Sequence, residues 1–344
     1  MSSLSRISSL PVVIVLTALL GLSLDAHGDD SPTSDSDFGP PEEPVVLRFQ
    51  WNEPLRYEID NQITTSFEES SDLRQVYSTR MVIDYRPLSR THRQLLPHWP
   101  LSLERDNGAD RRDQNHSHHR ALLARLEEVS SGFEEPEALS QPQRSYQLLK
   151  NATFSFQISP RGLIRDPRIH PPTSPLVRTT LEEVVHLFSD SHPLLPEEPV
   201  APGAEWHHSI HFSMSDSSVQ KTQETEFTYR FARWTPCENN WCAVIEVIQE
   251  IRAEALVVTG ERELRTSSQG EAKGVILFHP QRGKVLASQW FLDLRGTSRG
   301  TEGPSSEELR EFYHLPYHTR VEASTRLLSD FGGFDLTPFL QELQ

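Results

Sequence analysis

Apolar and polar side chains alternate along most of this chain, and a period of two is typical of half-buried β-strands. The first such segment lies near residues 45–69, and its apolar parity consists of Leu47, Phe49, Trp51, Tyr57, Ile59 and Ile63. Asn61 is the polar exception on that parity. Residues 74–88 repeat the pattern, so we expect the two segments to be long antiparallel neighbours.

The rest of the chain is largely of the same kind. Alternating segments cover residues 151–166, 204–214, 225–234, 242–258, 261–278, 285–296 and 318–331. Their wide spacing predicts long strands in an antiparallel meander. Such a sheet must curl or be covered, so the expected fold is mainly β with minor α: a strongly curved antiparallel sheet or half-open β-barrel with a helical lid.

Two segments have helical spacing instead. In residues 180–190, Thr180 and Glu183 fit a capping box, and Pro193 ends the helix. Its apolar face consists of Leu181, Val184, Val185 and Phe188. That face is either ordinary core or the lid of an apolar cavity. Residues 120–129 also have helical spacing, with Leu122, Leu123 and Leu126.

Two similar segments lie 121 residues apart, and in each an arginine directly precedes a glycine, Gly162 in the first and Gly283 in the second. Each glycine follows an apolar strand with a proline close by, and we expect both to form hairpin turns with positive φ. An anion-binding loop is the alternative for "HPQRGKV". Phosphate-binding glycine loops open a helix, whereas the residues after Gly283 have the pattern of a strand.

Residues 1–28 are typical of a signal peptide. Arg6 precedes a mostly apolar run from Leu10 to Leu24, and the small residues Ala26 and Gly28 predict cleavage after Gly28. An uncleaved signal anchor is the alternative. We therefore expect an exported protein, periplasmic or extracellular, without an integral membrane span in the mature chain.

The domain organisation follows from composition and from the glycine repeat. Residues 29–44 are acidic and rich in serine and proline, which predicts a disordered leader. Residues 45–344 are then a single β-rich domain in two pseudo-repeat halves, about 45–170 and 177–344. A polar insertion is expected near residues 89–143.

Charge and cysteine content narrow the range of partners. The 344 residues carry a formal charge of −16, from 33 basic and 49 acidic side chains, which disfavours nucleic-acid binding. Cys237 and Cys242 are the two cysteines. In an oxidising compartment we expect a disulfide that staples a hairpin, with two buried thiols as the alternative.

Three clusters carry candidate chemistry, and each has a plainer explanation. His207 and His211 would share one strand face about 13 Å apart, too far to chelate one metal, while His208 points the other way. The tract with His116, His118 and His119 has no carboxylate or cysteine at diagnostic spacing. Residues 189–193 contain Ser, Asp and His, but sequence neighbours rarely form a triad. We expect no catalytic residue, cofactor or metal.

The order of features resembles exported bacterial proteins of the DUF6263 type. The residues that match are Leu47, Phe49, Tyr57, Gly162, Leu195, Pro196, Pro199, Val200, Gly203, Trp206 and Gly283. Proteins of this type are similar to the half-open β-barrels of bacterial lipoprotein carriers (LolA-like). The resemblance implies a curved sheet with a helical lid over an apolar concave face, and it implies no catalytic residues.

The leading hypothesis from the sequence is a non-catalytic exported binding protein of the bacterial cell envelope, for a lipophilic ligand. The alternative is a structural or protein-interaction module of the envelope without a ligand. A hydrolase or metalloprotein is less favoured, because no polar cluster has the required spacing.

Overall fold

The structure is a computed structural model, and it describes residues 39–67, 70–89, 91, 94, 103–106, 119–133, 149–170, 181, 193–215, 219–237, 240–259, 262–302 and 310–328. These residues form β1 (Leu55–Phe67), β2 (Ser70–Leu88), β3 (Leu103–Asp106), β4 (Arg120–Phe133), β5 (Thr153–Ile158), β6 (Ile164–His170), β7 (Glu205–Ser215), β8 (Val219–Cys237), β9 (Asn240–Thr259), β10 (Arg262–His279), β11 (Lys284–Glu302) and β12 (Arg310–Leu327). Within this part of the chain, no helix has the length and apolar character needed to cross a membrane.

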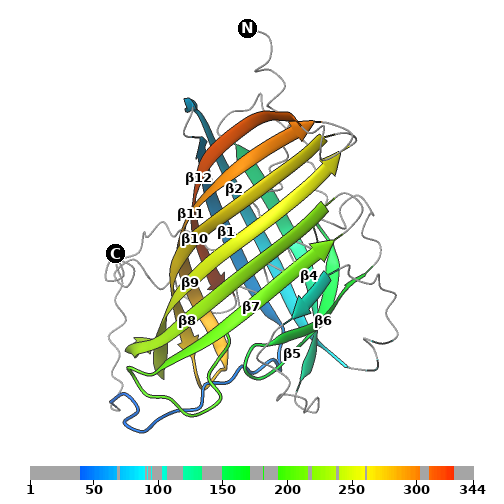
Figure 1. Cartoon of the computed structure of the whole chain (residues 1–344). Coiled ribbons are helices and arrows are strands. Elements are labelled where there is room, and N and C mark those ends of the chain that lie inside the picture. Colours follow the sequence, from blue (N-terminus) through cyan, green and yellow to red (C-terminus); the bar gives the residue numbers. More distant parts are fainter. Residues whose placement is uncertain are drawn as a thin grey trace.

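All the strands belong to one 12-stranded sheet, in the order β3-β7-β8-β9-β10-β11-β12-β1-β2-β4-β5-β6. Every neighbouring pair is antiparallel. The sheet curves until β8 to β10 cross in front of β1 and β2 (Figure 1). In the described chain β3 and β6 end the order and do not pair with each other. The predicted fold class, a strongly curved antiparallel sheet, is confirmed.

The pairing of β1 with β2 confirms that the first two alternating segments are antiparallel neighbours. Tyr57 lies opposite Ile83, and Ile63 lies opposite Tyr77. The same parity of β1 that the sequence marks as apolar is buried. Asn61, its polar exception, is also buried and donates a hydrogen bond to Thr79 Oγ1 at 2.8 Å. The buried amide of Asn61 thus has a hydrogen-bond partner on the neighbouring strand.

Buried side chains fill the inside of the curve, and the other parity faces outward. On β1 the outward positions include exposed Arg56 and Gln62. Glu58 is also on the outer face but is 1% exposed, because Arg80 of β2 and Arg326 of β12 form ion pairs with it. The Glu58 carboxylate therefore links β1 to its two neighbours in the sheet, β2 and β12.

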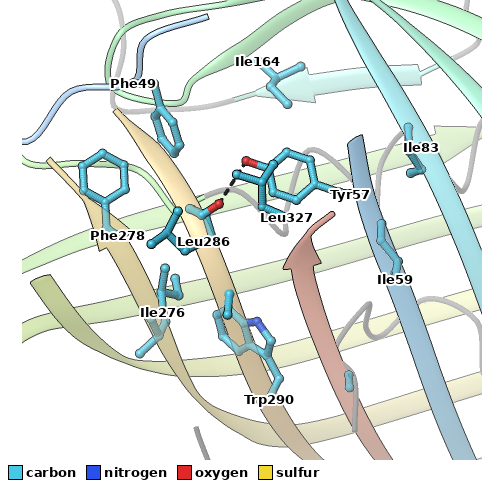
Figure 2. Packing of buried hydrophobic residues seen from close by; sticks show 14 of the residues in the cluster. Phe49, Tyr57, Ile59, Ile83, Ile164, Ile276, Phe278, Leu286, Trp290 and Leu327 are labelled. Carbon is cyan, nitrogen blue, oxygen red and sulfur yellow. Dashed lines mark hydrogen bonds between the residues drawn. The ribbon is translucent and has the colours of Figure 1, made fainter. Parts of the chain in front are cut away.

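Aromatic rings pack at the end of the sheet where β10 turns into β11 (Figure 2). Phe49 stacks on Trp51 with ring centroids 5.3 Å apart, and it meets the edge of Phe278 at 5.4 Å. Tyr57 donates a hydrogen bond from its hydroxyl to the carbonyl of Val285 at 3.1 Å. Large buried side chains close this end of the inner face.

The helix predicted for residues 120–129 is wrong, because these residues lie in β4. Leu122 and Leu126 occupy one strand face together with Ala124, and all three are buried. β4 pairs with β2 on one side and with β5 on the other. The region predicted as a polar insertion thus contributes two strands, β3 and β4, to the sheet.

The helix predicted for residues 180–190 lies outside the described residues except for Leu181, which is fully buried. Val184, Val185 and Phe188 are not among the described residues. The signal peptide and most of the acidic leader also lie outside them.

Both glycines of the repeat lie in turns between paired strands. Gly162 connects β5 to β6 with a φ of 98°, and Gly283 connects β10 to β11 with a φ of 59°. At another hairpin, between β8 and β9, Cys237 and Cys242 form the predicted disulfide, with Cα atoms 5.7 Å apart. The disulfide prediction is confirmed.

Candidate functional site

The inner face of the sheet changes in character along the strands. Away from the aromatic end, β9, β10 and β11 carry short side chains on their inner positions. We call this set the small-residue belt, and its members are Ala253, Ala255, Thr266, Ser268, Gly270, Gly296 and Ser298. The register places them on one face, because Ala255 lies opposite Thr266 and Thr266 lies opposite Ser298.

The belt is partly open to solvent, unlike the aromatic end. Ala253, Ala255, Ser268, Gly270 and Gly296 are only partly buried. Val257 and Leu264, which lie opposite each other just beyond the belt on the same face, are also partly buried. The sheet therefore presents apolar surface on its inner side that the described side chains do not fully cover.

Glycine is required at two positions of the belt. A Cβ on Gly296 would lie 2.5 Å from the ring and hydroxyl of Tyr317, so the tyrosine ring occupies the space above Gly296. A Cβ on Gly270 would overlap the backbone carbonyl of Asp293. Close approach of an aromatic ring and of a neighbouring strand explains these two glycines within a strand.

Two buried hydroxyl groups at the belt have unused hydrogen-bonding capacity among the described residues. Ser298 is 5% exposed and its Oγ has no partner there, and Tyr317 is 4% exposed and has no acceptor there for its own proton. Burial raises the pKa of the Tyr317 hydroxyl, and a hydrogen bond from the Ser268 hydroxyl opposes this rise. Leaving buried hydroxyls unsatisfied is costly, so these two groups are polar atoms of the belt that a ligand could satisfy.

Polar side chains of β8 border the belt on its other side. Lys221 lies opposite Ala255 and Gln223 lies opposite Ala253. Lys221 is 8% exposed, with its ammonium 5.7 Å from the centre of the Phe212 ring. A cation, an amide and several hydroxyls thus surround apolar surface on the inner face.

The outer face carries a row of acidic side chains across four neighbouring strands. Glu226 lies opposite Glu250, Glu250 opposite Glu271, and Glu271 opposite Asp293. We call these four residues the acidic row. Asp293 accepts a hydrogen bond from His318 at 2.8 Å and forms an ion pair with Arg320 at 3.6 Å, both on β12. Like charges directly opposite each other repel, and Lys273, which pairs with Glu271 at 3.2 Å, offsets part of this repulsion.

The histidines of β7 have the predicted arrangement. His207 and His211 are exposed on the outer face, whereas His208 is buried and stacks on Phe227. Of the histidine tract in the predicted insertion, only His119 is described, and it is buried. Within the described chain, no group of three or more His, Cys, Asp or Glu residues could hold a metal ion.

The loop "HPQRGKV" is a tight turn whose lysine is buried and ion-paired. Lys284 is 3% exposed and forms an ion pair with Glu53. The amide of Gly283 donates to the carbonyl of Pro280 at 3.3 Å, which closes the turn. An anion-binding loop would present its lysine to solvent, so the arrangement favours a structural hairpin.

Sequence reasoning missed the belt, although the sequence contains a signal for it. Inner positions 253 and 255 of β9 are both Ala, and inner positions 266, 268 and 270 of β10 are Thr, Ser and Gly. Recognising this requires knowing which parity faces inward and which segments are neighbours.

No protein-family model matches the chain, and no curated protein matches it. Among solved structures, the COG4313 outer membrane channel from Pseudomonas putida F1 is 7% identical, with 84% of this chain and 100% of that chain covered and a TM-score of 0.19. OmpT, an outer membrane protein of Vibrio cholerae, is 7% identical, with 82% of this chain and 99% of that chain covered and a TM-score of 0.17. At these TM-scores the likeness carries no inference.

Proposed function

We propose that this chain is an exported, non-catalytic binding protein of the bacterial cell envelope that holds a lipophilic ligand against the small-residue belt. The observation that carries the proposal is the partly open apolar surface of Ala253, Ala255, Val257 and Leu264 on the inner side of a curved sheet. Partly covered apolar surface inside a fold is where lipophilic ligands bind, because binding removes that surface from water.

The outer face and the disulfide support the proposal that the protein is exported and has its outer face in water. Outward positions of neighbouring strands carry charged side chains, such as Arg252 and Glu254 of β9, which suits contact with water. The Cys237–Cys242 disulfide fits an oxidising compartment, and the resemblance to lipoprotein-carrier-like proteins points to the same setting.

The experiment is a titration of the purified mature protein with N-phenyl-1-naphthylamine, a neutral dye whose fluorescence rises in apolar surroundings. The variant Ala255→Phe places an aromatic ring on the belt, and we expect it to weaken dye binding by about tenfold or more. Glu254→Phe is the matched control, because it adds the same ring to the neighbouring outer position. Equal dye binding by the wild type and Ala255→Phe would count against the belt as the binding surface.

A second candidate is a protein-interaction module without a ligand, which the acidic row favours. Ile248 is 39% exposed two residues from Glu250 on the same outer face, so apolar and acidic surface adjoin there. Native mass spectrometry after gentle purification separates the candidates. A co-purifying lipid supports the binding protein. A protein partner that is lost in the variant Glu226→Lys/Glu250→Lys supports the module.

A further inference from the structure

Resting on the proposed function, we propose that the ligand is an amphiphile with an oxygen-bearing acyl head group, a carboxyl or an acyl ester, whose oxygen atoms accept hydrogen bonds from Ser298 and Tyr317. Its hydrocarbon part lies against the partly open apolar residues of β9 and β10. The proposal names the chemical class of the ligand, which apolar surface alone leaves open.

The hydroxyls of Ser298 and Tyr317 both lie within the small-residue belt. Tyr317 lies opposite Gly296 and Ser298 lies opposite Thr266, so both residues are on the inner face within the belt. The ring and hydroxyl of Tyr317 extend over Gly296 toward β10, where a Cβ on Gly296 would meet them and the carbonyl of Ser267. The tyrosine hydroxyl therefore reaches the centre of the belt.

Both side chains are more than nine-tenths buried, and the described chain leaves hydrogen-bonding capacity on both hydroxyls unused. Ser298 Oγ has no partner there, and Tyr317, whose oxygen interacts with the Ser268 hydroxyl, has no acceptor for its own proton. A purely hydrocarbon ligand would leave them unsatisfied, whereas an acceptor oxygen would satisfy them. The resulting difference in binding favours a ligand with oxygen in its head group.

Both hydroxyls can act as hydrogen-bond donors to a ligand. Burial raises the pKa of the Tyr317 hydroxyl, so this group stays protonated across the physiological range and acts as a donor. A serine hydroxyl is likewise available as a donor. Two donors that converge on apolar surface match the carbonyl or carboxyl oxygen of an acyl group.

Apolar surface lies next to the two hydroxyls on the inner face. Ala255 lies opposite Thr266 in the same row as Ser298, and Val257 and Leu264 lie one step farther along the same face. These apolar residues are partly open, so a hydrocarbon chain has a contact surface beside the hydroxyls.

The test is displacement of N-phenyl-1-naphthylamine by three probes that share one chain: decane, methyl decanoate and decanoate. We expect the wild type to bind the two oxygen-bearing probes about tenfold more tightly than decane. The variants Tyr317→Phe and Ser298→Ala should each reduce that preference by about fivefold. Ser267→Ala is the matched control, because its hydroxyl lies on the outer face next to Ser268.

The outcomes separate this inference from the proposed function. Dye binding with equal affinity for all three probes would overturn the head-group inference and leave the proposed function standing. Failure of the dye and of every probe to bind would overturn the proposed function and this inference with it. A preference for oxygen-bearing probes that survives Tyr317→Phe/Ser298→Ala would also overturn the inference. Thermal unfolding of each variant checks that the fold is intact.

Discussion

The backbone amide of Gln50 donates a hydrogen bond to the carbonyl of Gly283 at 2.9 Å, and the adjacent amide of Phe49 donates to the carbonyl of Pro160 at 2.6 Å. Two hairpin turns that are far apart in the chain are thus held by neighbouring residues of one N-terminal segment. This segment also contributes Phe49 to the aromatic end of the core. The turns of the sequence repeat are therefore joined in space.

Replacing Gly162 with alanine should destabilise the protein by more than the strain of a positive φ alone. The new Cβ would lie 2.5 Å from the carbonyl oxygen of Pro193 and 2.8 Å from the Phe49 ring. We expect a loss of about 3 kcal/mol, measured by urea unfolding. Gly203→Ala is the control, because Gly203 has a φ of 93° with nothing within 4 Å of the new Cβ. Equal losses for the two variants would contradict the packing argument.

Removal of the disulfide should lower stability by about 2 kcal/mol, because the loop that it closes is short. The bond joins residues with a sequence separation of 5 across the β8–β9 hairpin. The variant Cys237→Ala/Cys242→Ala and the reduced wild type should show similar decreases in Tm. Unchanged Tm in both samples would mean that the bond contributes nothing to the folded state.

Neutralising the centre of the acidic row should stabilise the protein. Glu250 lies between Glu226 and Glu271, so Glu250→Gln relieves repulsion on both sides and should add about 0.5 kcal/mol. Added salt should reduce this gain, because these side chains are exposed and their repulsion is screened. Glu254→Gln is the control, since Glu254 lies opposite Thr222 and Ser267. A gain of the same size in the control would argue against repulsion along the row.

Stability should fall above about pH 10, because buried tyrosines resist ionisation in the folded state. Burial raises the pKa of the Tyr57 hydroxyl, and the charge of Arg282 opposes this rise only in part. The unfolded tyrosine loses its proton first, so the unfolded state binds fewer protons and stability decreases as the pH rises. The contribution is fully present below the unfolded pKa and is lost as the pH rises toward the folded pKa.

The variant Tyr57→Phe separates this effect from other alkaline changes. It should lose about 1 kcal/mol at neutral pH, because the hydrogen bond to Val285 disappears. Between about pH 9 and pH 11 it should then lose less stability than the wild type, as measured by urea unfolding at each pH. Parallel pH profiles for the two proteins would show that Tyr57 is not responsible.

Local alternation predicted which side chains of a strand share a face, but it did not distinguish every strand from a helix. Leu122 and Leu126 are four residues apart, so they share a face in either structure. Ala124 distinguishes the strand from the helix. In a strand it lies on the same face as Leu122 and Leu126, and it is fully buried between them. The strand forms because β2 and β5 supply hydrogen-bonding partners on both sides of β4.

The amino-acid sequence by itself determined the two faces of most strands and the turns at Gly162 and Gly283, and it favoured the pairing of the two cysteines, because each depends on residues that are close in the chain. Only the tertiary structure decided that β1 lies between β12 and β2, and that short side chains of β9, β10 and β11 meet Ser298 and Tyr317 on one inner surface. That surface depends on the register between strands, and register is set by the packing of the whole core rather than by any local pattern.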